Sequence, residues 1–500
     1  MKYYLLALLA GVIFPLGFAP FNIWPLVILS LSWLLYLLRN EETKRAFFLG
    51  FIYGIGMWGL GVSWVYVSIH YHGNIGIIYS LLITFAFIVF LSLYIGLITF
   101  LFQYLKTTNK TLNYLVFFPV IWVSIELLRS YFLTGFPWLI IGTSLAGTSF
   151  GGWIPVLGSY GGSVFVLMMS GCLSLIYEKS IKNNVYPVYI IIIILISSFS
   201  LNKINWTSEI GKINASIYQP NLTLQKKWST QGILLTTNLI QTAVENAQNN
   251  EFIFFPETAL ILERQEIEPW ISIIETKAKE KNISLITGII ARDFKEEALI
   301  ERFNRVQGFG SIKGKYDKHQ LVPFGEYIPL RSITGKILDI MDLNLVNTLP
   351  GKDFTKLISK KVIISPSICY EVAFNDLVRK TAKSSNLLVT ISNDTWFGES
   401  FGPAQHLEIA QTRALEHQKS LIRATNSGIS AIISKNGEII KKQGLFESKT
   451  LKGKVKLYEG STLFSITGNY LLVVYIMIVM LYLFYYNRTK VPLIYKNYVK

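Results

Sequence analysis

The sequence predicts an α-helical membrane bundle of about eight spans joined to one α/β domain. Charged residues make up only 16% of the 500 residues, whereas soluble chains have about 25%, and the mean hydropathy is +0.41. Residues 1–200 and 465–487 are strongly apolar, but 203–460 has the composition of a soluble domain. We therefore expect a membrane domain of about seven helices at 1–202, an extracytoplasmic domain at 203–460, and a last span with a basic cytoplasmic tail at 461–500.

The apolar stretches set the expected number of spans, because a helix needs about 20 apolar residues to cross the hydrocarbon core. The N-terminus is similar to a signal peptide, but it has no convincing small-residue cleavage site and further apolar stretches follow at once. We interpret it as a retained first helix. Spans are expected at about 3–19, 22–38, 46–67, 76–104, 114–131, 159–177, 185–201 and 466–487.

Loop charges predict the orientation of these spans, since Lys and Arg accumulate in short cytoplasmic loops. Twelve Lys and Arg residues flank the spans on one side, and the loops near 20–21, 68–75 and 132–158 on the other side contain none. Both termini are therefore expected in the cytoplasm. The 203–460 domain, between the seventh and eighth spans, is expected outside the cytoplasmic membrane.

The net charge of +16 does not indicate a nucleic-acid partner. Lys and Arg lie partly beside apolar stretches, and the chain lacks the basic–aromatic strip of single-strand binding proteins. The two cysteines, Cys172 and Cys369, lie in different regions, which argues against a disulfide framework and leaves Cys369 as a candidate reactive thiol. The sequence has no zinc-spacing cluster, phosphate loop or GxSxG motif, so we expect no metal and no cofactor.

Short β-branched stretches alternate with helical ones after residue 213, which predicts helices covering a sheet. Helices are expected at 229–248, 266–281 and 403–419. The expected strands are INASIYQP, EFIFFPET, ISLITGII, VIISPSICYE and NLLVTISND, followed by a hairpin in LIRATNSGISAIISKNGEII with a tight turn at Asn436–Gly437.

Three residues at predicted strand ends suggest one chemistry. Glu257 follows FIFFP, Lys318 lies in KYDKHQLVPFGE, and Cys369 ends VIISPSIC. Taken singly, they are also compatible with a helix N-cap, a solvated surface cation and a small core residue. Together they fit acyl transfer, because a neighbouring cation favours the thiolate form of a cysteine and a carboxylate can take the proton of the thiol. The ammonium and a backbone N–H beside the sulfur can stabilise an oxyanion.

Five motifs in fixed order add a resemblance. FFPET, YDKHQLVPFGEYIP, SICYE, NDTWFG and RATNSG are similar to the nitrilase superfamily, which carries a Glu–Lys–Cys triad. The spans, with GFAPF near the N-terminus and TGFPW at 134–138, resemble its membrane-embedded branch, the bacterial apolipoprotein N-acyltransferases. The resemblance covers nearly the whole chain, and it is strong across 213–435 and looser in the membrane part.

The resemblance implies a nitrilase-like αββα sandwich and a ping-pong reaction. An acyl chain from a phospholipid would form a thioester with the cysteine and then pass to the α-amine of a diacylglyceryl cysteine in an apolipoprotein. Glu257 matches the general base, Lys318 the oxyanion lysine and Cys369 the nucleophile.

Four further positions match the family. Glu326 of PFGE matches a second acid that orients Lys318 or the base, and the positions near the substrate are Trp228, Tyr370 and Glu371. The alternatives are a loop anchor for Glu326 and an ordinary core residue for Trp228.

The segment 327–350 mixes apolar residues with few charges, and we expect it to cover the acyl chain and touch the membrane. Two other functions stay open. A membrane-tethered amidase or nitrilase-like hydrolase would pass the acyl group to water, and a transporter or scaffold would carry a degenerate outer domain. The intact Glu, Lys and Cys argue against the transporter or scaffold. A monomer is the default expectation.

Overall fold

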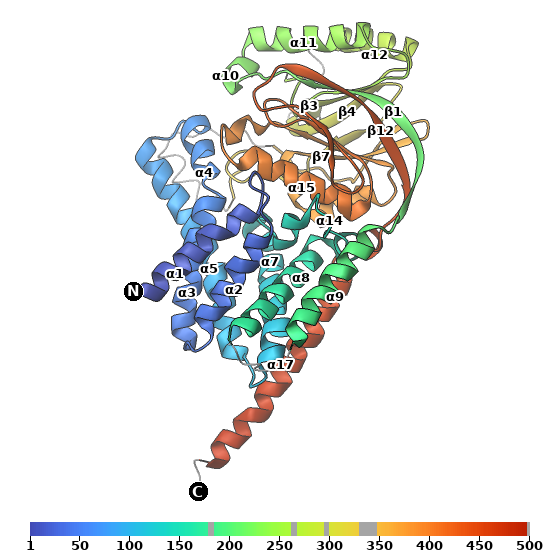
Figure 1. The fold of residues 1–500 in the computed structure, drawn as a ribbon. Helices are drawn as coiled ribbons and strands as arrows, with labels where there is room; N and C mark the ends of the chain where they lie inside the picture. The colour runs from blue at the N-terminus through green and yellow to red at the C-terminus, as the bar shows by residue number, and fades with distance from the viewer. Residues whose placement is uncertain (179–184, 262–267, 295–299, 330–347, 498–500) are drawn as a thin grey trace. The chain divides into compact units, whose positions relative to one another are not determined.

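The computed structural model describes residues 1–178, 185–261, 268–294, 300–329 and 348–497. They form two compact units (Figure 1). The first unit comprises Met1–Ile204, Glu399–Glu408 and Thr467–Lys500, and the second comprises Asn205–Gly398 and Ile409–Ile466. The division into 1–202, 203–460 and 461–500 stays a prediction.

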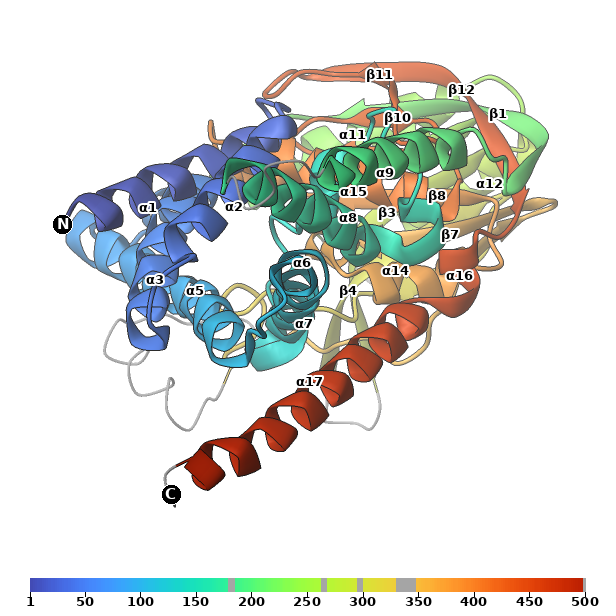
Figure 2. The same cartoon turned by 60° about the horizontal axis from the view of Figure 1, so that its bottom comes forward.

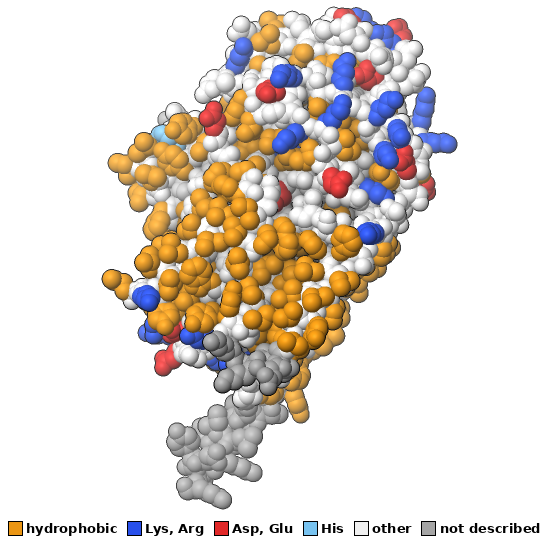
Figure 3. All heavy atoms as spheres, in the orientation of Figure 1, with side chains coloured by type: hydrophobic (Ala, Val, Ile, Leu, Met, Phe, Trp, Pro, Cys, Tyr) orange, Lys and Arg blue, Asp and Glu red, His pale blue; other side chains and the backbone are white. Residues whose placement is uncertain are grey.

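The first unit is built of apolar helices, and apolar side chains cover much of the face of these helices seen in Figure 3. Each of the eight apolar stretches contains helix. The helices are α1 (Lys2–Ile13), α2 (Pro25–Leu38), α3 (Thr43–Gly61), α4 (Trp64–Val67), α5 (Ile77–Leu105), α6 (Lys110–Leu112), α7 (Phe118–Tyr131), α8 (Ile154–Tyr177), α9 (Tyr186–Asn202) and α17 (Tyr470–Asn497).

Not all of these helices have the length of a membrane span. Within the described residues, three are long and apolar enough to cross a membrane: α5, α8 and the helical stretch Lys110–Thr134. A fourth arises if α3 and Trp64–His72, which are bent by 52°, form one span. The shorter apolar helical stretches have 10–17 residues and are Lys2–Gly17, Pro25–Leu38, Tyr186–Asn202 and, within α17, Tyr470–Tyr486. The 14 residues of α2 rise about 21 Å against a hydrocarbon core of about 30 Å. The count of eight spans therefore stays a prediction.

Helix α3 packs against both α1 and α5, as Figure 2 also shows. Two glycines allow the close approach. A Cβ at Gly11 of α1 would lie 2.0 Å from the carbonyl oxygen of Tyr53, and a Cβ at Gly50 of α3 would lie 2.1 Å from Oγ1 of Thr99. Helix association in lipid depends on such close packing, because the lipid tails are as apolar as the side chains.

The segment Glu399–Glu408 belongs to the first unit although it is distant from the rest in sequence. The side-chain oxygen of Gln405 accepts hydrogen bonds from the indole N–H groups of Trp64 (3.2 Å) and Trp138 (2.7 Å). Its amide donates to the carbonyl of Gly61 (3.1 Å). All the polar atoms of this buried side chain are thereby used, which avoids the cost of burying unpaired groups.

The second unit contains two six-stranded sheets. The first has the order β12 (Lys449–Gly460), β1 (Thr207–Gln219), β2 (Phe252–Phe254), β3 (Ser284–Phe294), β4 (Ile300–Gly310) and β5 (Lys315–Asp317). The second has the order β11 (Ile439–Lys442), β10 (Ala431–Ile433), β9 (Leu421–Thr425), β8 (Leu387–Ser392), β7 (Val362–Ile368) and β6 (Leu357–Ser359).

The two sheets share one apolar core, which includes Ile217 and Phe254 of the first sheet and Ile364 and Ile391 of the second. Apolar side chains of α11 (Thr230–Glu245) and α12 (Glu268–Glu280) pack on the first sheet around Phe255. On the second sheet, α14 (Asn375–Ala382) packs against β7. The α/β domain with two sheets expected from the sequence is confirmed.

Three elements complete the second unit. They are the short helix α10 (Leu224–Lys227), α15 (Gly402–His417), whose first residues belong to the first unit, and α16 (Leu463–Thr467). The expected hairpin is present as β9, β10 and β11, with Gly437 at a φ of 79° in the last turn. Residues 330–347 of the segment expected to cover the acyl chain lie outside the described residues.

Candidate active site

Glu257 lies in a turn directly after the short strand β2, and its side chain is buried. The turn packs on Gly288 of β3, where a Cβ would approach the Cα of Glu257 to 2.7 Å. A glycine is required at this place because any side chain would push the turn away from the sheet. The end of a core strand therefore positions the carboxylate.

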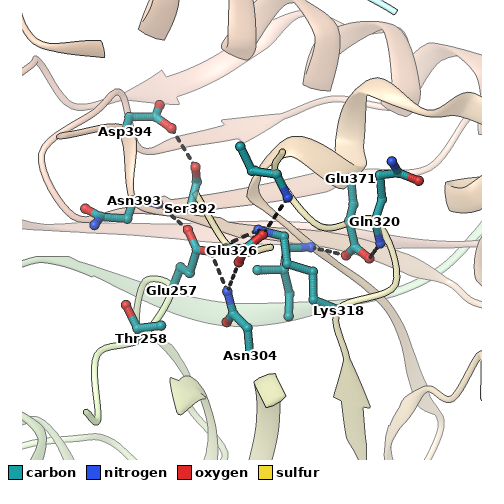
Figure 4. Close-up of polar contacts among 12 residues, drawn as sticks. Glu257, Thr258, Asn304, Lys318, Gln320, Glu326, Glu371, Ser392, Asn393 and Asp394 are labelled. Atoms are coloured by element: carbon teal, nitrogen blue, oxygen red, sulfur yellow. Dashed lines mark hydrogen bonds and ion pairs between the residues drawn. The ribbon is translucent and has the colours of Figure 1, made fainter. Parts of the chain in front are cut away.

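Both oxygens of Glu257 accept hydrogen bonds from the surrounding site (Figure 4). Oε1 accepts from the amide of Asn304 (2.8 Å) and from Nζ of Lys318 (3.4 Å). Oε2 accepts from the backbone N–H of Asn393 (2.8 Å). These donors come from three different segments and hold the carboxylate in one orientation.

Lys318 follows β5 and is only 1% exposed, so the alternative of a solvated surface cation is wrong. Its Nζ lies 2.9 Å from Oε2 of Glu326 and 3.4 Å from Oε1 of Glu257. Burial alone would lower the pKa of Lys318, but Glu326, Glu257 and the Cys369 thiol raise it by more, so the net pKa is raised. The ammonium is therefore charged at any physiological pH.

Glu326 lies beside Lys318 in the same network. Its Oε1 accepts from Nζ of Lys318 (3.0 Å) and from the amide of Asn304 (3.1 Å), and its Oε2 accepts from the backbone N–H of Val322 (2.8 Å). Asn304 thus donates to both carboxylates, and Lys318 lies between them. The bond to Val322 also fixes the loop, so Glu326 is a loop anchor and an ion-pair partner at once.

Cys369 comes directly after β7 with a φ of 53°, in the left-handed region that few residues other than glycine adopt. The side chain is partly buried. Burial, Glu257 and Asp394 raise the pKa of its thiol, Lys318 and a hydrogen bond with Ser392 lower it in part, and the net pKa is about 12. Lys318 thus favours the thiolate form, as expected, but burial outweighs its effect, so the resting group is a neutral thiol.

Glu371 links the segment of Lys318 to the turn of Cys369. Its Oε2 accepts from the backbone N–H of Ile368 (2.7 Å). Its Oε1 accepts from the backbone N–H groups of His319 (2.6 Å) and Gln320 (3.2 Å) and from the hydroxyl of Tyr316 (3.1 Å). Burial raises the pKa of Glu371 to about 7, although the backbone donors and Lys318 lower it. This carboxylate holds two catalytic segments together.

The comparison with known proteins decides the family. Residues 10–172 match the apolipoprotein N-acyltransferase N-terminal domain, and residues 214–461 match the carbon-nitrogen hydrolase family. The apolipoprotein N-acyltransferase of Pseudomonas aeruginosa is 35% identical over 466 residues, which cover 92% of this chain and 91% of that protein. The chain belongs to the apolipoprotein N-acyltransferase family.

Further relatives agree with this assignment. The apolipoprotein N-acyltransferase of Haemophilus influenzae is 34% identical over 490 residues, covering 93% of this chain and 91% of that protein. The one of Coxiella burnetii is 33% identical over 461 residues, covering 91% and 94%. These sequence relatives confirm the expected family and its acyltransferase class. Among solved structures, Saccharomyces cerevisiae Nit3 of the nitrilase superfamily aligns with a TM-score of 0.38 and 16% identity over 51% of this chain and 92% of that one.

Two residues matched to the family's substrate region are Trp228 and Tyr370. Trp228 is 51% exposed, so the alternative of an ordinary core residue is wrong. Tyr370 is partly buried, and its ring meets Phe374 edge-on at 5.1 Å.

Sequence reasoning missed three polar groups of the site. Asn304 lies inside β4, in a stretch without any motif. Only the pairing of β4 with its neighbouring strands places it near the carboxylates of Glu257 and Glu326. Asn393 belongs to the motif NDTWFG. The motif pointed to this segment, but it did not show that the backbone N–H of Asn393 donates to Glu257. Lys227 stands next to Trp228 and has the same sequence signal as the exposed Lys226.

Replacing Glu371 with alanine should strongly destabilise the second unit. The buried N–H of Ile368 and the partly buried N–H groups of His319 and Gln320 would lose their acceptor, and an unpaired buried donor costs about 1–3 kcal/mol. We expect urea unfolding in detergent to show a loss of about 3 kcal/mol or more. Tyr316→Phe, which removes a single donor, should cost only about 1 kcal/mol. Equal losses in the two variants would contradict the linking role of Glu371.

Proposed function

We propose that Cys369 carries an acyl chain as a thioester between a phospholipid and the α-amine of the diacylglyceryl cysteine of an apolipoprotein. The observation that carries this proposal is the convergence of one carboxylate and one ammonium on a single thiol, since Glu257 and Lys318 both act on Cys369. Family membership supplies the acyltransferase class, and the geometry supports these three residues as the group that performs the reaction.

In the first half-reaction, Glu257 takes the thiol proton of Cys369 while the sulfur attacks the ester carbonyl of the phospholipid. The ester oxygen becomes an oxyanion, which the ammonium of Lys318 stabilises together with a backbone N–H beside the sulfur. The intermediate then breaks its bond to the glycerol oxygen. Protonated Glu257 returns its proton to that oxygen, so a lysophospholipid leaves and the thioester remains.

In the second half-reaction, the α-amine of the apolipoprotein attacks the thioester carbonyl. Glu257 takes a proton from the attacking nitrogen and Lys318 again stabilises the oxyanion. The carbon–sulfur bond breaks and the thiol of Cys369 recovers its proton from Glu257. The products are an N-acylated lipoprotein and the starting enzyme.

The supporting residues have distinct proposed tasks. Glu326 orients Lys318 through two oxygen contacts, and Glu371 holds the segments of Lys318 and Cys369 together. Trp228 and Tyr370 are proposed to contact the substrates. Neutralisation of the buried ammonium by Glu326 is needed because an unpaired buried charge is costly.

An apolar rim supports a lipid substrate. Trp228, Phe324 and Trp396 are large side chains that are 41–51% exposed, and each lies within two residues of a polar group of the site. Exposed aromatic rings of this kind suit an acyl chain. From the loop charges we propose that the site lies on the periplasmic side of the inner membrane, where both substrates are anchored. We also propose that the protein works as a monomer.

Transfer of a labelled acyl group tests the proposal. The purified protein is incubated with acyl-labelled phospholipid in mixed micelles, and we expect label on the protein that hydroxylamine releases. A diacylated lipopeptide with a free α-amine should then discharge the label rapidly, with the label recovered in the peptide. An N-acetylated form of the same peptide is the matched control and should leave the thioester intact.

The outcome also separates the proposal from a membrane-tethered hydrolase. If water discharges the thioester as fast as the free lipopeptide does, the acyl group is transferred to water and the N-acyltransferase assignment is wrong. If no hydroxylamine-sensitive label forms at all, the thioester route is wrong.

A further inference from the structure

A second buried lysine lies in the active site. Lys227 ends helix α10 and is only 5% exposed, whereas its neighbour Lys226 is exposed. Its Nζ donates to the backbone carbonyl of Glu257 (2.9 Å) and to Oγ1 of Thr258 (2.5 Å). Burial of an ammonium is costly unless it is paired and hydrogen-bonded, so this arrangement requires a specific compensating role.

Lys227 binds the main chain at the point where the proposed base is attached. Thr258, the next residue, has a φ of 47°, a conformation that is strained for a β-branched side chain. Lys227 holds this residue from both sides, through the carbonyl that precedes it and through its hydroxyl. The lysine therefore fixes the turn from which the Glu257 side chain reaches the thiol.

Lys227 also adds a second ammonium to the site. Glu257 and Glu326 are two carboxylates that pair with the ammonium of Lys318. An ammonium has three N–H donors, and within the described residues Lys227 uses two of them. The titratable groups that act on Lys227 are Glu257, after β2, and Cys369, after β7. The positive charge of Lys227 is therefore set beside the proposed base and the thiol.

We propose that Lys227 is a positioning residue for acyl transfer, which holds the main chain of Glu257 in place so that the carboxylate can receive the Cys369 proton, and whose positive charge stabilises the Glu257 carboxylate. This inference rests on the proposed function. In the step that it supports, the S–H bond of Cys369 breaks and an O–H bond forms on Glu257. Lys227 keeps its own proton throughout.

The charge of Lys227 gives this role a pH signature. Burial lowers the pKa of Lys227 to about 8, although Glu257 and Cys369 raise it in part. Acyl transfer should therefore slow above about pH 8, where the ammonium becomes a neutral amine. Within the site, the pKa of the Cys369 thiol is about 12 and that of Lys318 is raised, so both titrate well above pH 8. Glu371, with a pKa of about 7, and Lys419, with a pKa of about 8, titrate close to the pKa of Lys227, so the Lys227 variants are needed to assign the fall.

Three lysine variants test the inference through single-turnover loading from acyl-labelled phospholipid between pH 6 and 10. Lys227→Met should load about tenfold or more slowly, since a well-placed general base contributes about 10²–10⁴ in rate, and its profile should lack the fall near pH 8. Lys227→Arg keeps a cation that does not deprotonate. It should retain more activity than the Met variant, without the fall near pH 8. Lys226→Met is the matched control and should behave as the wild type.

A lipid-independent measurement separates this inference from the proposed function. Iodoacetamide alkylation of Cys369, followed in a Cys172→Ala background, reports thiol activation even if no phospholipid reacts. The Lys227→Met variant should be alkylated several-fold more slowly than the wild type, with the same change in its pH profile. Loss of folded protein would lower the alkylation rate by the same factor at every pH and would leave the shape of the pH profile unchanged.

Two results would overturn the role of Lys227. One is a fall near pH 8 that persists in Lys227→Met or Lys227→Arg, because another group would then cause it. The other is loading and alkylation of Lys227→Met at the wild-type rate. Failure of the wild type to load from phospholipid, with alkylation that still depends on Lys227, would instead reject the proposed function alone.

Discussion

Replacing Cys369 with alanine should abolish both the hydroxylamine-sensitive acyl label and the N-acylation of lipopeptide. The thiol is the only proposed site of acyl attachment, and Glu257 and Lys318 act on it directly. Removal of a covalent nucleophile from a cooperating catalytic group costs on the order of 10⁶-fold in turnover. The measurement is the amount of acyl label on the protein after a single turnover, followed by the amount of label transferred to the lipopeptide.

Two further variants make this result specific. Cys369→Ser keeps the shape of the side chain but supplies a hydroxyl in place of the thiol, so it should load far more slowly while the protein remains folded. Cys172→Ala removes the other cysteine, which is buried in α8, and should load normally. Wild-type labelling of Cys369→Ala would place the nucleophile elsewhere and overturn the mechanism.

Replacing Lys318 with methionine should have the second largest effect, on both activity and stability. The variant loses the oxyanion cation, and it leaves the buried Glu257 and the partly buried Glu326 around Asn304 without the ammonium between them. Breaking a buried ion pair by removing one partner costs about 3–5 kcal/mol. We expect acyl loading to fall below detection and the urea unfolding midpoint in detergent to fall clearly.

A second substitution separates the two effects of Lys318. Glu326→Gln removes one of the two uncompensated carboxylates, so Lys318→Met with Glu326→Gln should recover part of the lost stability but no loading. Because the pKa of Lys318 is raised above its usual 10.5, its contribution to stability is fully present below about pH 10.5 and is lost only at more alkaline pH. An equal stability loss in the single and double variants would contradict the ion-pair account.

Local sequence patterns predicted most of the second unit, because strand and helix signals depend on neighbouring residues. The buried stretch before Glu257, the stretch ending at Cys369 and the Asn436–Gly437 turn all lie where the patterns placed them. The number of membrane spans was harder to predict, because hydropathy measures apolar length and does not register where a helix breaks. Two places show this: the helix bends between α3 and Trp64–His72, and α2 has only 14 residues.

The charge state of the thiol also required the structure. The sequence predicted that a lysine would favour the thiolate, and Lys318 does lower the thiol pKa, but burial and the Glu257 carboxylate outweigh it and the pKa is about 12. The balance depends on how many charges surround the sulfur and how far water is excluded, and neither quantity is encoded in local spacing. The same reason explains why Lys227 and Lys226 could not be told apart before the fold was known.

By itself, the sequence determined that the chain carries apolar helices, an α/β domain and a Glu–Lys–Cys set at strand ends, since these follow from composition, periodicity and short motifs. Only the tertiary structure decided which groups meet. The N–H of Asn393 reaches Glu257 across 136 residues of chain, and Asn304 joins two carboxylates from within a featureless strand. Such contacts depend on the order of strands in the two sheets, because long-range neighbours are set by topology and not by local propensity.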